Sequence, residues 1–429
     1  MRSTNAAILV FIIAVAACAI PVTRTFSAIA AETGMSDWGY VMVGGQNGTW
    51  FGPGQAPRLE RIDLGNYFVT PLVPAPTEGT VWSGGWNGSQ WLISGWGEDL
   101  QTANGSNPYI FLYNGLHQVV GGSLNQYQAE ATWHGGDIFG ASSDGDDWLV
   151  SGLGSGNLTS YGNSNHMSLA LFNGTDFTDL SAMLPNQRDA ILYTNAWNGK
   201  YWLIGGGFYG TGALYSFNGS NIVDLAPMLS DAVRSFGSVQ SVAWNGYYWL
   251  IGGVNFLATY DGHKFQDLTP RLDAVLELNG GCCGPVNAIA WDGEEWVLGG
   301  GTPVAQVSSS HAWLAKYTAG VFTDLTSKIA PTELDRLQDS SILSIAASDR
   351  SWIIGGYSNG KGLLYEYTEK SFSNISYLVD NYTYVNWVGA HFLPPRTPTF
   401  GKPGGIPQAE PEIALLSLQC LRRYDLRLR

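Results

Sequence analysis

Short apolar runs alternate with glycine- and asparagine-rich turns along most of the chain. In the clearest stretch, four such runs fall within residues 196–206, 214–219 and 222–225. Asn-Gly dipeptides separate the first run from the second and the third from the fourth. Such a dipeptide between apolar runs is the strongest short signal for a β-hairpin, because both residues tolerate positive φ. The pattern predicts four short antiparallel strands joined by tight turns.

The same unit recurs along the chain, and each copy carries an aliphatic run that ends in Gly-Gly or Ser-Gly. The seven runs begin at Val41, Trp91, Trp148, Trp202, Trp249, Trp296 and Trp352. The tryptophans are spaced by about 47 to 57 residues, which suits propeller blades better than solenoid coils. The sequence therefore predicts an all-β fold, a seven-bladed β-propeller of four-stranded blades, over residues 32–393.

The first copy lacks residues for a first strand of its own once residues 1–31 are set aside. Residues 386–392 supply one, because they align with residues 196–202. We expect this C-terminal strand to complete the first blade and close the ring. Closure removes the exposed sheet edges that an open array would present.

The fourth run of several copies ends in Asp-Leu followed by Ser or Thr, at residues 179–181, 267–269 and 324–326. Ser and Thr are good N-caps, and Pro suits the first helical position. We expect a hydroxyl-capped helical turn after each fourth strand, with Pro270 as a first helical residue.

The N-terminus has the order of an export signal. Arg2 precedes an unbroken apolar run from Ala6 to Ile20, and small residues follow at Ala28, Ala30 and Ala31. The run is shorter than the roughly 20 residues that span a bilayer. We predict a cleaved signal peptide over residues 1–31 and a secreted or cell-surface location, with an uncleaved membrane anchor as the alternative.

Glycosylation sequons fit an exported protein. They lie at Asn47, Asn87, Asn104, Asn157, Asn173, Asn218, Asn374 and Asn381. Five of them coincide with Asn-Gly dipeptides, where Asn is also wanted for its backbone conformation. Turn chemistry is therefore the alternative explanation for those five.

Composition and charge limit the classes of partner that the protein can bind. Charged residues make up only 13% of the chain, and the formal net charge is −14 with no basic stripe. Phosphate binding depends on clustered Lys and Arg, so the sequence argues against a nucleic-acid partner. Hydrophobic residues at 45% and aromatic residues at 13% are sufficient for a sizeable core.

The C-terminal part has no strand pattern. Residues 394–411 read as an extended Pro/Gly linker, and residues 412–429 as a short apolar run with a basic end. The apolar run is too short to span a membrane. It has the order of a sorting or anchor signal, and a disordered tail is the alternative.

These features resemble the Kelch class of β-propellers, whose pattern is an aliphatic strand ending in Gly-Gly, a spaced Tyr, and a Leu after the last strand. Gly205, Gly206, Tyr215 and Leu225 occupy these places. The resemblance covers about residues 36–393 and implies a scaffold that binds ligands or proteins. Kelch repeats have a Trp in the last strand, and this chain has Phe or Ile at that position. A few Kelch-like propellers, such as the galactose oxidase group, are enzymes.

In a propeller, the connections between strands lie on two opposite faces of the ring. Tight Asn-Gly turns form one face, whereas the variable loops between strands two and three and between blades form the other, which is where function usually lies. Trp96, Phe208 and Tyr357 directly follow the glycine of the second strand. They are candidate binding residues for sugar rings or peptide side chains, with loop packing as the alternative.

Four arginines lie between blades, each near an aspartate: Arg188, Arg234, Arg271 and Arg336. One Arg per blade on one face can make a ring that binds an anionic group. Structural salt bridges between blades are the competing explanation.

Cys282 and Cys283 are adjacent and flanked by glycines. In an oxidising compartment they can form a vicinal disulfide. A free thiol pair and a soft-metal site are the alternatives. The six histidines show no ligand spacing with these cysteines, so we expect no metal site and no cofactor.

The favoured function is a binding module, outside the cytoplasm, that recognises a glycan, a peptide or a surface protein. A secreted carbohydrate-active hydrolase or oxidase is the alternative, and a structural envelope component attached to the membrane through either end is another. The sequence contains no Gly-x-Ser-x-Gly, His-Glu-x-x-His or phosphate-loop motif.

Overall fold

The computed structural model describes the propeller region in thirteen segments. They are residues 39–48, 55–72, 78–98, 106–114, 136–155, 165–185, 190–208, 211–233, 236–276, 284–301, 311–329, 339–348 and 351–391. The predicted signal peptide, linker and tail lie outside these segments.

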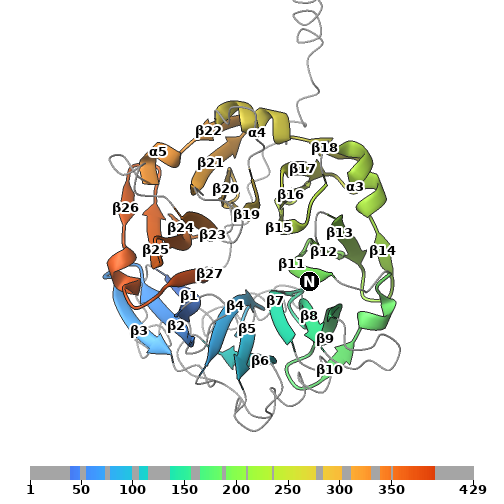
Figure 1. The fold of residues 1–429 in the computed structure, drawn as a ribbon, viewed down its shortest axis with the longest axis horizontal. Helices are drawn as coiled ribbons and strands as arrows, with labels where there is room; N and C mark the ends of the chain where they lie inside the picture. Colours follow the sequence, from blue (N-terminus) through green and yellow to red (C-terminus); the bar gives the residue numbers. More distant parts are fainter. Residues whose placement is uncertain are drawn as a thin grey trace, which may run out of the picture.

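Seven antiparallel sheets stand around a common axis (Figure 1). Six have four strands, and the sheet of blade 2 has three within the described residues. The innermost strands contact one another in order around the axis. The prediction of a seven-bladed, all-β propeller is confirmed.

The strands are given blade by blade, from the axis outward. Blade 1 has β27 (Tyr384–His391), β1 (Tyr40–Asn47), β2 (Ala56–Asp63) and β3 (Phe68–Leu72); blade 2 has β4 (Gly79–Trp86), β5 (Trp91–Glu98) and β6 (Ser106–Tyr113). Blade 3 has β7 (Gly136–Ser143), β8 (Trp148–Ser155), β9 (Asn165–Phe172) and β10 (Phe177–Asp179); blade 4 has β11 (Ile191–Trp197), β12 (Trp202–Phe208), β13 (Thr211–Phe217) and β14 (Ile222–Asp224).

Blade 5 has β15 (Val239–Trp244), β16 (Trp249–Gly253), β17 (Phe256–Tyr260) and β18 (Phe265–Asp267); blade 6 has β19 (Val286–Trp291), β20 (Trp296–Gly300), β21 (Trp313–Thr318) and β22 (Val321–Asp324). Blade 7 has β23 (Ser340–Ala347), β24 (Trp352–Ser358), β25 (Lys361–Tyr367) and β26 (Phe372–Asn374). Short helices follow the outer strands: η1 (Ser181–Met183), α3 (Ala226–Ala232), α4 (Thr269–Val275), α5 (Thr326–Ile329) and η3 (Ser376–Val379).

The last strand closes the ring. β27 pairs with β1 in antiparallel register, with Tyr40 opposite His391 and Gly44 opposite Trp387. It also packs between the innermost strands of blades 7 and 2. The predicted completion of the first blade by a C-terminal strand is confirmed.

The glycine pairs allow close approach within and between blades. A Cβ on Gly205 would collide with Val239 of the next blade, and one on Gly206 would collide with the carbonyl oxygen of Ile191 in its own blade. The second strand ends at the glycine pair, as expected, in β16 and β20, which end at Gly253 and Gly300. In contrast, β12 continues to Phe208. The first glycine is therefore needed for the seam between blades, and the second for pairing with the innermost strand.

Aromatic side chains fill these seams. Trp249 donates its indole N–H to the hydroxyl of Tyr201 in the preceding blade at 3.0 Å, and Trp296 donates to Tyr248 at 3.1 Å. Apolar side chains of adjacent blades form shared clusters around these pairs. The core is thus distributed over the seams.

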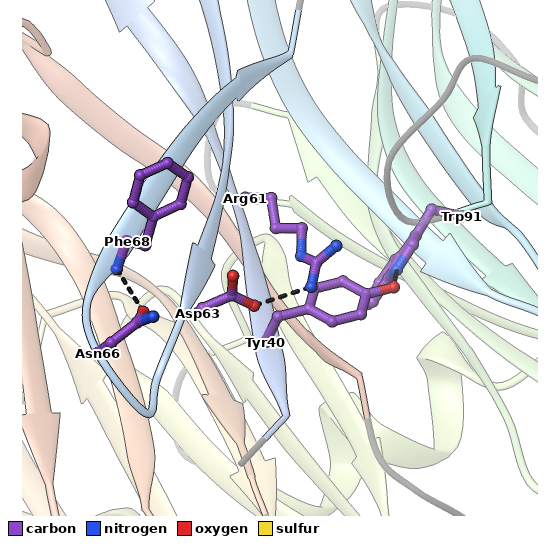
Figure 2. Close-up of polar contacts among 6 residues, drawn as sticks. All are labelled: Tyr40, Arg61, Asp63, Asn66, Phe68 and Trp91. Carbon is purple, nitrogen blue, oxygen red and sulfur yellow. Dashed lines mark hydrogen bonds and ion pairs between the residues drawn. The ribbon is translucent and has the colours of Figure 1, made fainter. Parts of the chain in front are cut away.

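The seam between blades 1 and 2 adds a buried charge (Figure 2). Trp91 donates its indole N–H to the hydroxyl of Tyr40 at 3.1 Å, and the Arg61 guanidinium lies 4.2 Å from the centre of the Tyr40 ring. Arg61 also pairs with Asp63 at 2.8 Å. This cation–π contact and ion pair offset part of the cost of burying Arg61, which is 3% exposed and whose Nε atom has no partner among the described residues.

The helical turns after the fourth strands differ from the expected capping. In α4 the N-cap residue is Leu268, which has no side-chain cap, and Thr269 is the first helical residue, so Pro270 is the second. The Thr269 hydroxyl instead accepts the backbone N–H of Leu257, at 2.9 Å, while Asp267 accepts the N–H of Thr269, at 2.9 Å. The hydroxyl therefore bonds to the third strand, β17, at Leu257, which has no partner on the fourth strand, β18. The prediction that the hydroxyl caps the helical turn was wrong.

Candidate functional site

A β-bulge interrupts the innermost strand of every blade. In β11, for example, the register with β12 shifts between Leu192 and Thr194 and leaves Tyr193 without a partner. Bulges re-aim side chains and frequently occur beside functional sites. The equivalent residues, which we call the bulge ring, are Trp82, Phe139, Tyr193, Gln240, Asn287, Leu343 and Asn386.

Three consecutive residues of the bulge ring are aromatic. Trp82 lies 5.3 Å from Phe139, and Phe139 lies 5.8 Å from Tyr193, measured between ring centroids. The three side chains come from consecutive blades and are half-buried. They form a continuous aromatic arc on the innermost strands β4, β7 and β11, which face the axis in Figure 1.

The next blades form a hollow with polar groups. It has a volume of about 140 Å³ and touches the innermost strands of blades 4 to 7. Thr194, Gln240, Ser241, Asn287 and Ser344 supply its polar groups, and the remaining lining residues are aliphatic. No lining residue carries an ionisable side chain.

Hydrogen bonds fix this polar wall from blade to blade. Ser241 donates to the carbonyl oxygen of Val286 at 2.8 Å, and Asn287 donates through Nδ2 to the carbonyl oxygen of Ile342 at 3.1 Å. Each acceptor is the residue just before a bulge, where the irregular ladder leaves a carbonyl to be satisfied. The wall is therefore preorganised by bonds that lie outside the regular ladders.

Three polar groups of the wall have no such bond within the described residues. They are the whole amide of Gln240, the Oδ1 atom of Asn287 and the hydroxyl of Thr194. Together they offer donors and acceptors without net charge.

Blade 3 holds a buried acid near the aromatic arc. Asp137, two residues before Phe139, is 7% exposed, and its Oδ1 atom has no hydrogen-bond partner in the segments that the structure describes. Burial raises the pKa of Asp137 to about 7. This carboxyl group therefore changes charge near neutral pH.

Two of the three candidate aromatics, Trp96 and Tyr357, have side chains within the described part of the structure, and their environments differ. Tyr357 is only 2% exposed, with its ring 4.9 Å from that of Tyr384. This position fits the loop-packing alternative, since a ligand cannot reach the ring. Trp96 is half-buried at the end of β5, and Phe208 ends β12. The side chain of Phe208 lies outside the described part of the structure, and Trp96 and Tyr357 belong to different blades, 2 and 7.

Of the four candidate arginines, Arg271 lies within the described residues, whereas Arg188, Arg234 and Arg336 lie outside them. Arg271 is on α4, on the outer circumference of the ring in Figure 1. It is close enough to Tyr317 of the next blade to act on it electrostatically. Its position is remote from the axial hollow. Cys282 and Cys283 also lie outside the described residues.

Six candidate glycosylation sites are described, and Asn104 and Asn157 lie outside the described residues. Asn47, Asn173, Asn218, Asn374 and Asn381 are exposed, and Asn87 is half-buried. The Oδ1 atom of Asn173 accepts the backbone N–H groups of Thr175 and Asp176, at 2.9 and 2.7 Å. The turn role that sequence suggested for such residues is therefore present, and it leaves Nδ2 unused by these bonds.

Among the residues that the structure describes, no three His, Cys, Asp or Glu side chains group together as metal ligands. Within the same segments, no helix is long and apolar enough to cross a bilayer.

Sequence reasoning missed the bulge ring. It placed ligand contacts on the variable loops, because tight turns and regular strands offered no obvious site. A signal was present: Trp82, Phe139 and Tyr193 each lie four residues before the end of an innermost strand. Aromatic residues at one position of three consecutive copies mark a surface that runs across blades.

No protein-family model matches the sequence, and no curated protein is significantly similar to it. Similar solved structures include TolB from Acinetobacter baumannii, at 13% identity and a TM-score of 0.41, covering 85% of this chain and 70% of that one. A putative 6-phosphogluconolactonase from Bacteroides fragilis is similar at 11% identity and a TM-score of 0.46, covering 83% and 98%. The structure of YCF48 bound to D1 peptide is similar at 10% identity and a TM-score of 0.40, covering 70% and 82%. At these values the similarities give no information on function, and the strand pairing of this chain itself identifies a seven-bladed β-propeller.

Proposed function

We propose that this protein is an exported propeller of Kelch-like type that binds a glycan, a peptide or a surface protein at its axis. The observation that carries the proposal is the bulge ring, with its aromatic arc and its wall of neutral amide and hydroxyl groups. Binding sites commonly combine aromatic side chains with a few fixed polar groups. Both components are present here on rigid strands.

Binding fits the lining better than catalysis does. Glycoside hydrolysis uses two carboxyl groups that flank the scissile bond. The hollow is lined by hydroxyl, amide and aliphatic side chains. The alternative of a carbohydrate-active enzyme therefore gains no support from this hollow.

The described part of the chain enters and leaves the propeller on the tight-turn face. Tyr40 and His391 are paired at the tight-turn end of blade 1. The variable-loop face lies at the opposite end of these strands.

A binding screen with the full-length chain tests the proposal. Glycans, linear peptides and extracellular proteins form three separate sets of probes. We expect binding from at least one set that Gln240→Leu weakens and that Tyr247→Leu, on an exposed turn of blade 5, leaves unchanged. Failure to bind any set, or binding that Gln240→Leu does not alter, would contradict a site at the axis.

Export and redox state need tests of their own. N-terminal sequencing of the native protein should begin near residue 32, and cytoplasmic full-length protein would refute export. Alkylation without reduction should leave Cys282 and Cys283 unmodified if they form the proposed vicinal disulfide.

A further inference from the structure

The chemistry of the aromatic arc and of the polar wall restricts which ligands the axial site can bind. The free polar groups of the wall are the amide of Gln240, the Oδ1 atom of Asn287 and the hydroxyl of Thr194. They provide both donors and acceptors, but no charge. A buried charged group of a ligand would find no counter-charge among the lining residues, and leaving it unpaired is costly. The lining therefore selects against anionic and cationic ligand groups.

The aromatic arc adds a different requirement. Trp82, Phe139 and Tyr193 are half-buried and in mutual contact at 5.3 and 5.8 Å. Their rings provide an extended apolar surface on another part of the bulge ring. None of the three rings lines the hollow, so a ligand that uses both surfaces extends from the polar wall across the axis to the rings. Such a ligand needs hydroxyl groups for the wall and apolar faces for the rings. The pyranose units of a glycan have both, because their C–H groups and hydroxyl groups point in different directions.

The volume of the hollow limits how much of a ligand can enter it. The hollow measures about 140 Å³, whereas pockets for drug-sized ligands are roughly 300 to 1,000 Å³. It has room for one small unit, with the rest of a larger ligand outside. We infer that the axial site binds a terminal neutral sugar of a glycan, and this inference rests on the binding function proposed above.

The test compares immobilised oligosaccharides with neutral hexose ends, the same oligosaccharides carrying sulfate or sialic acid, and a library of linear peptides. We expect the full-length protein to bind one or more neutral glycans. Gln240→Leu, which removes the amide at similar volume, and Trp82→Leu, which removes one ring, should each weaken binding by about tenfold or more, equivalent to 1.4 kcal/mol. Tyr247→Leu, on the tight-turn face, should bind as the unaltered protein does.

Folding of each variant is checked by thermal unfolding, and Gln240→Leu keeps the test valid if Trp82→Leu does not fold. Binding only to sulfated or sialylated glycans would overturn the sugar inference, as would neutral-glycan binding that survives both substitutions. Peptide binding that both substitutions weaken would overturn the inference and leave the proposed axial function standing. Absence of binding in all three sets would refute both.

Discussion

The hydroxyl of Tyr201 accepts the indole N–H of Trp249 across the seam between blades 4 and 5, at 3.0 Å. Trp249 is fully buried, so water cannot replace this partner. Tyr201→Phe should lower the free energy of unfolding by about 1 to 3 kcal/mol, because it leaves a buried donor unpaired. Urea unfolding followed by fluorescence measures the change, with the exposed Tyr247→Phe as the control. Equal stability of Tyr201→Phe and the unaltered protein would show that this bond is not needed.

The same bond is missing at both seams of blade 3. Gln90 and Asp147 occupy the place of the tyrosine, and the Nε1 atoms of Trp148 and Trp202 are buried without a hydrogen-bond partner among the described residues. Asp147→Tyr should supply the partner for Trp202 and raise the free energy of unfolding by about 1 kcal/mol.

The same substitution at the exposed neighbour Asp146 is the matched control for Asp147→Tyr, since it removes a similar charge without reaching the seam. Thermal and urea unfolding both report the difference. If Asp146→Tyr stabilises as much as Asp147→Tyr, the gain comes from reduced charge repulsion in the turn and not from the new bond.

Asp137 makes stability depend on pH. Its ordinary pKa is 3.8, and burial raises it to about 7 in the folded chain. Between these values the folded state binds more protons than the unfolded state, so stability falls as pH rises through this window and is then constant. The shift of roughly three units corresponds to about 4 kcal/mol at most.

Asp137→Asn should therefore be more stable than the unaltered protein at pH 8, and its stability should change less between pH 5 and pH 8. Urea unfolding across this range tests the prediction, with Asp146→Asn as an exposed control. A variant that is less stable than the unaltered protein at pH 8 would mean that a partner compensates the buried carboxylate.

The seam at Gly205 has no room for a methyl group. Gly205→Ala should lower the free energy of unfolding by about 1 to 3 kcal/mol, because the new Cβ would collide with Val239. Combining it with Val239→Ala should cost less than the two single changes together, by about 1 kcal/mol, since the smaller side chain makes room. Strict additivity in this double-mutant cycle would exclude the collision as the cause.

The repeated hairpin signals were sufficient to predict the architecture. Asn-Gly turns gave the strand order of each blade, and the shortage of residues before Val41 led to the pairing of Trp387 with the first blade. The role of the Thr269 hydroxyl was not predicted correctly. From the sequence it could either cap the helical turn or bond to the third strand, and only the position of that strand shows that it does the second.

The candidate site was the least predictable part. Exposure of Trp96 or Tyr357 depends on how adjacent blades approach, which a single repeat does not reveal. The bulge ring depends on register, and a shift of one residue reverses which side chains face the axis. Such a shift is set by pairing across strands, as at Tyr193, and not by local propensity.

The place of β27 in blade 1 also governs the order of events during biosynthesis. The innermost strand of the first blade is the last of the described strands to be synthesised, so one edge of β1 stays unpaired while the other six blades are made. Unpaired edges recruit other chains. A chain truncated before Tyr384 would keep that edge permanently, and it would be prone to aggregation even though most of its blades were complete.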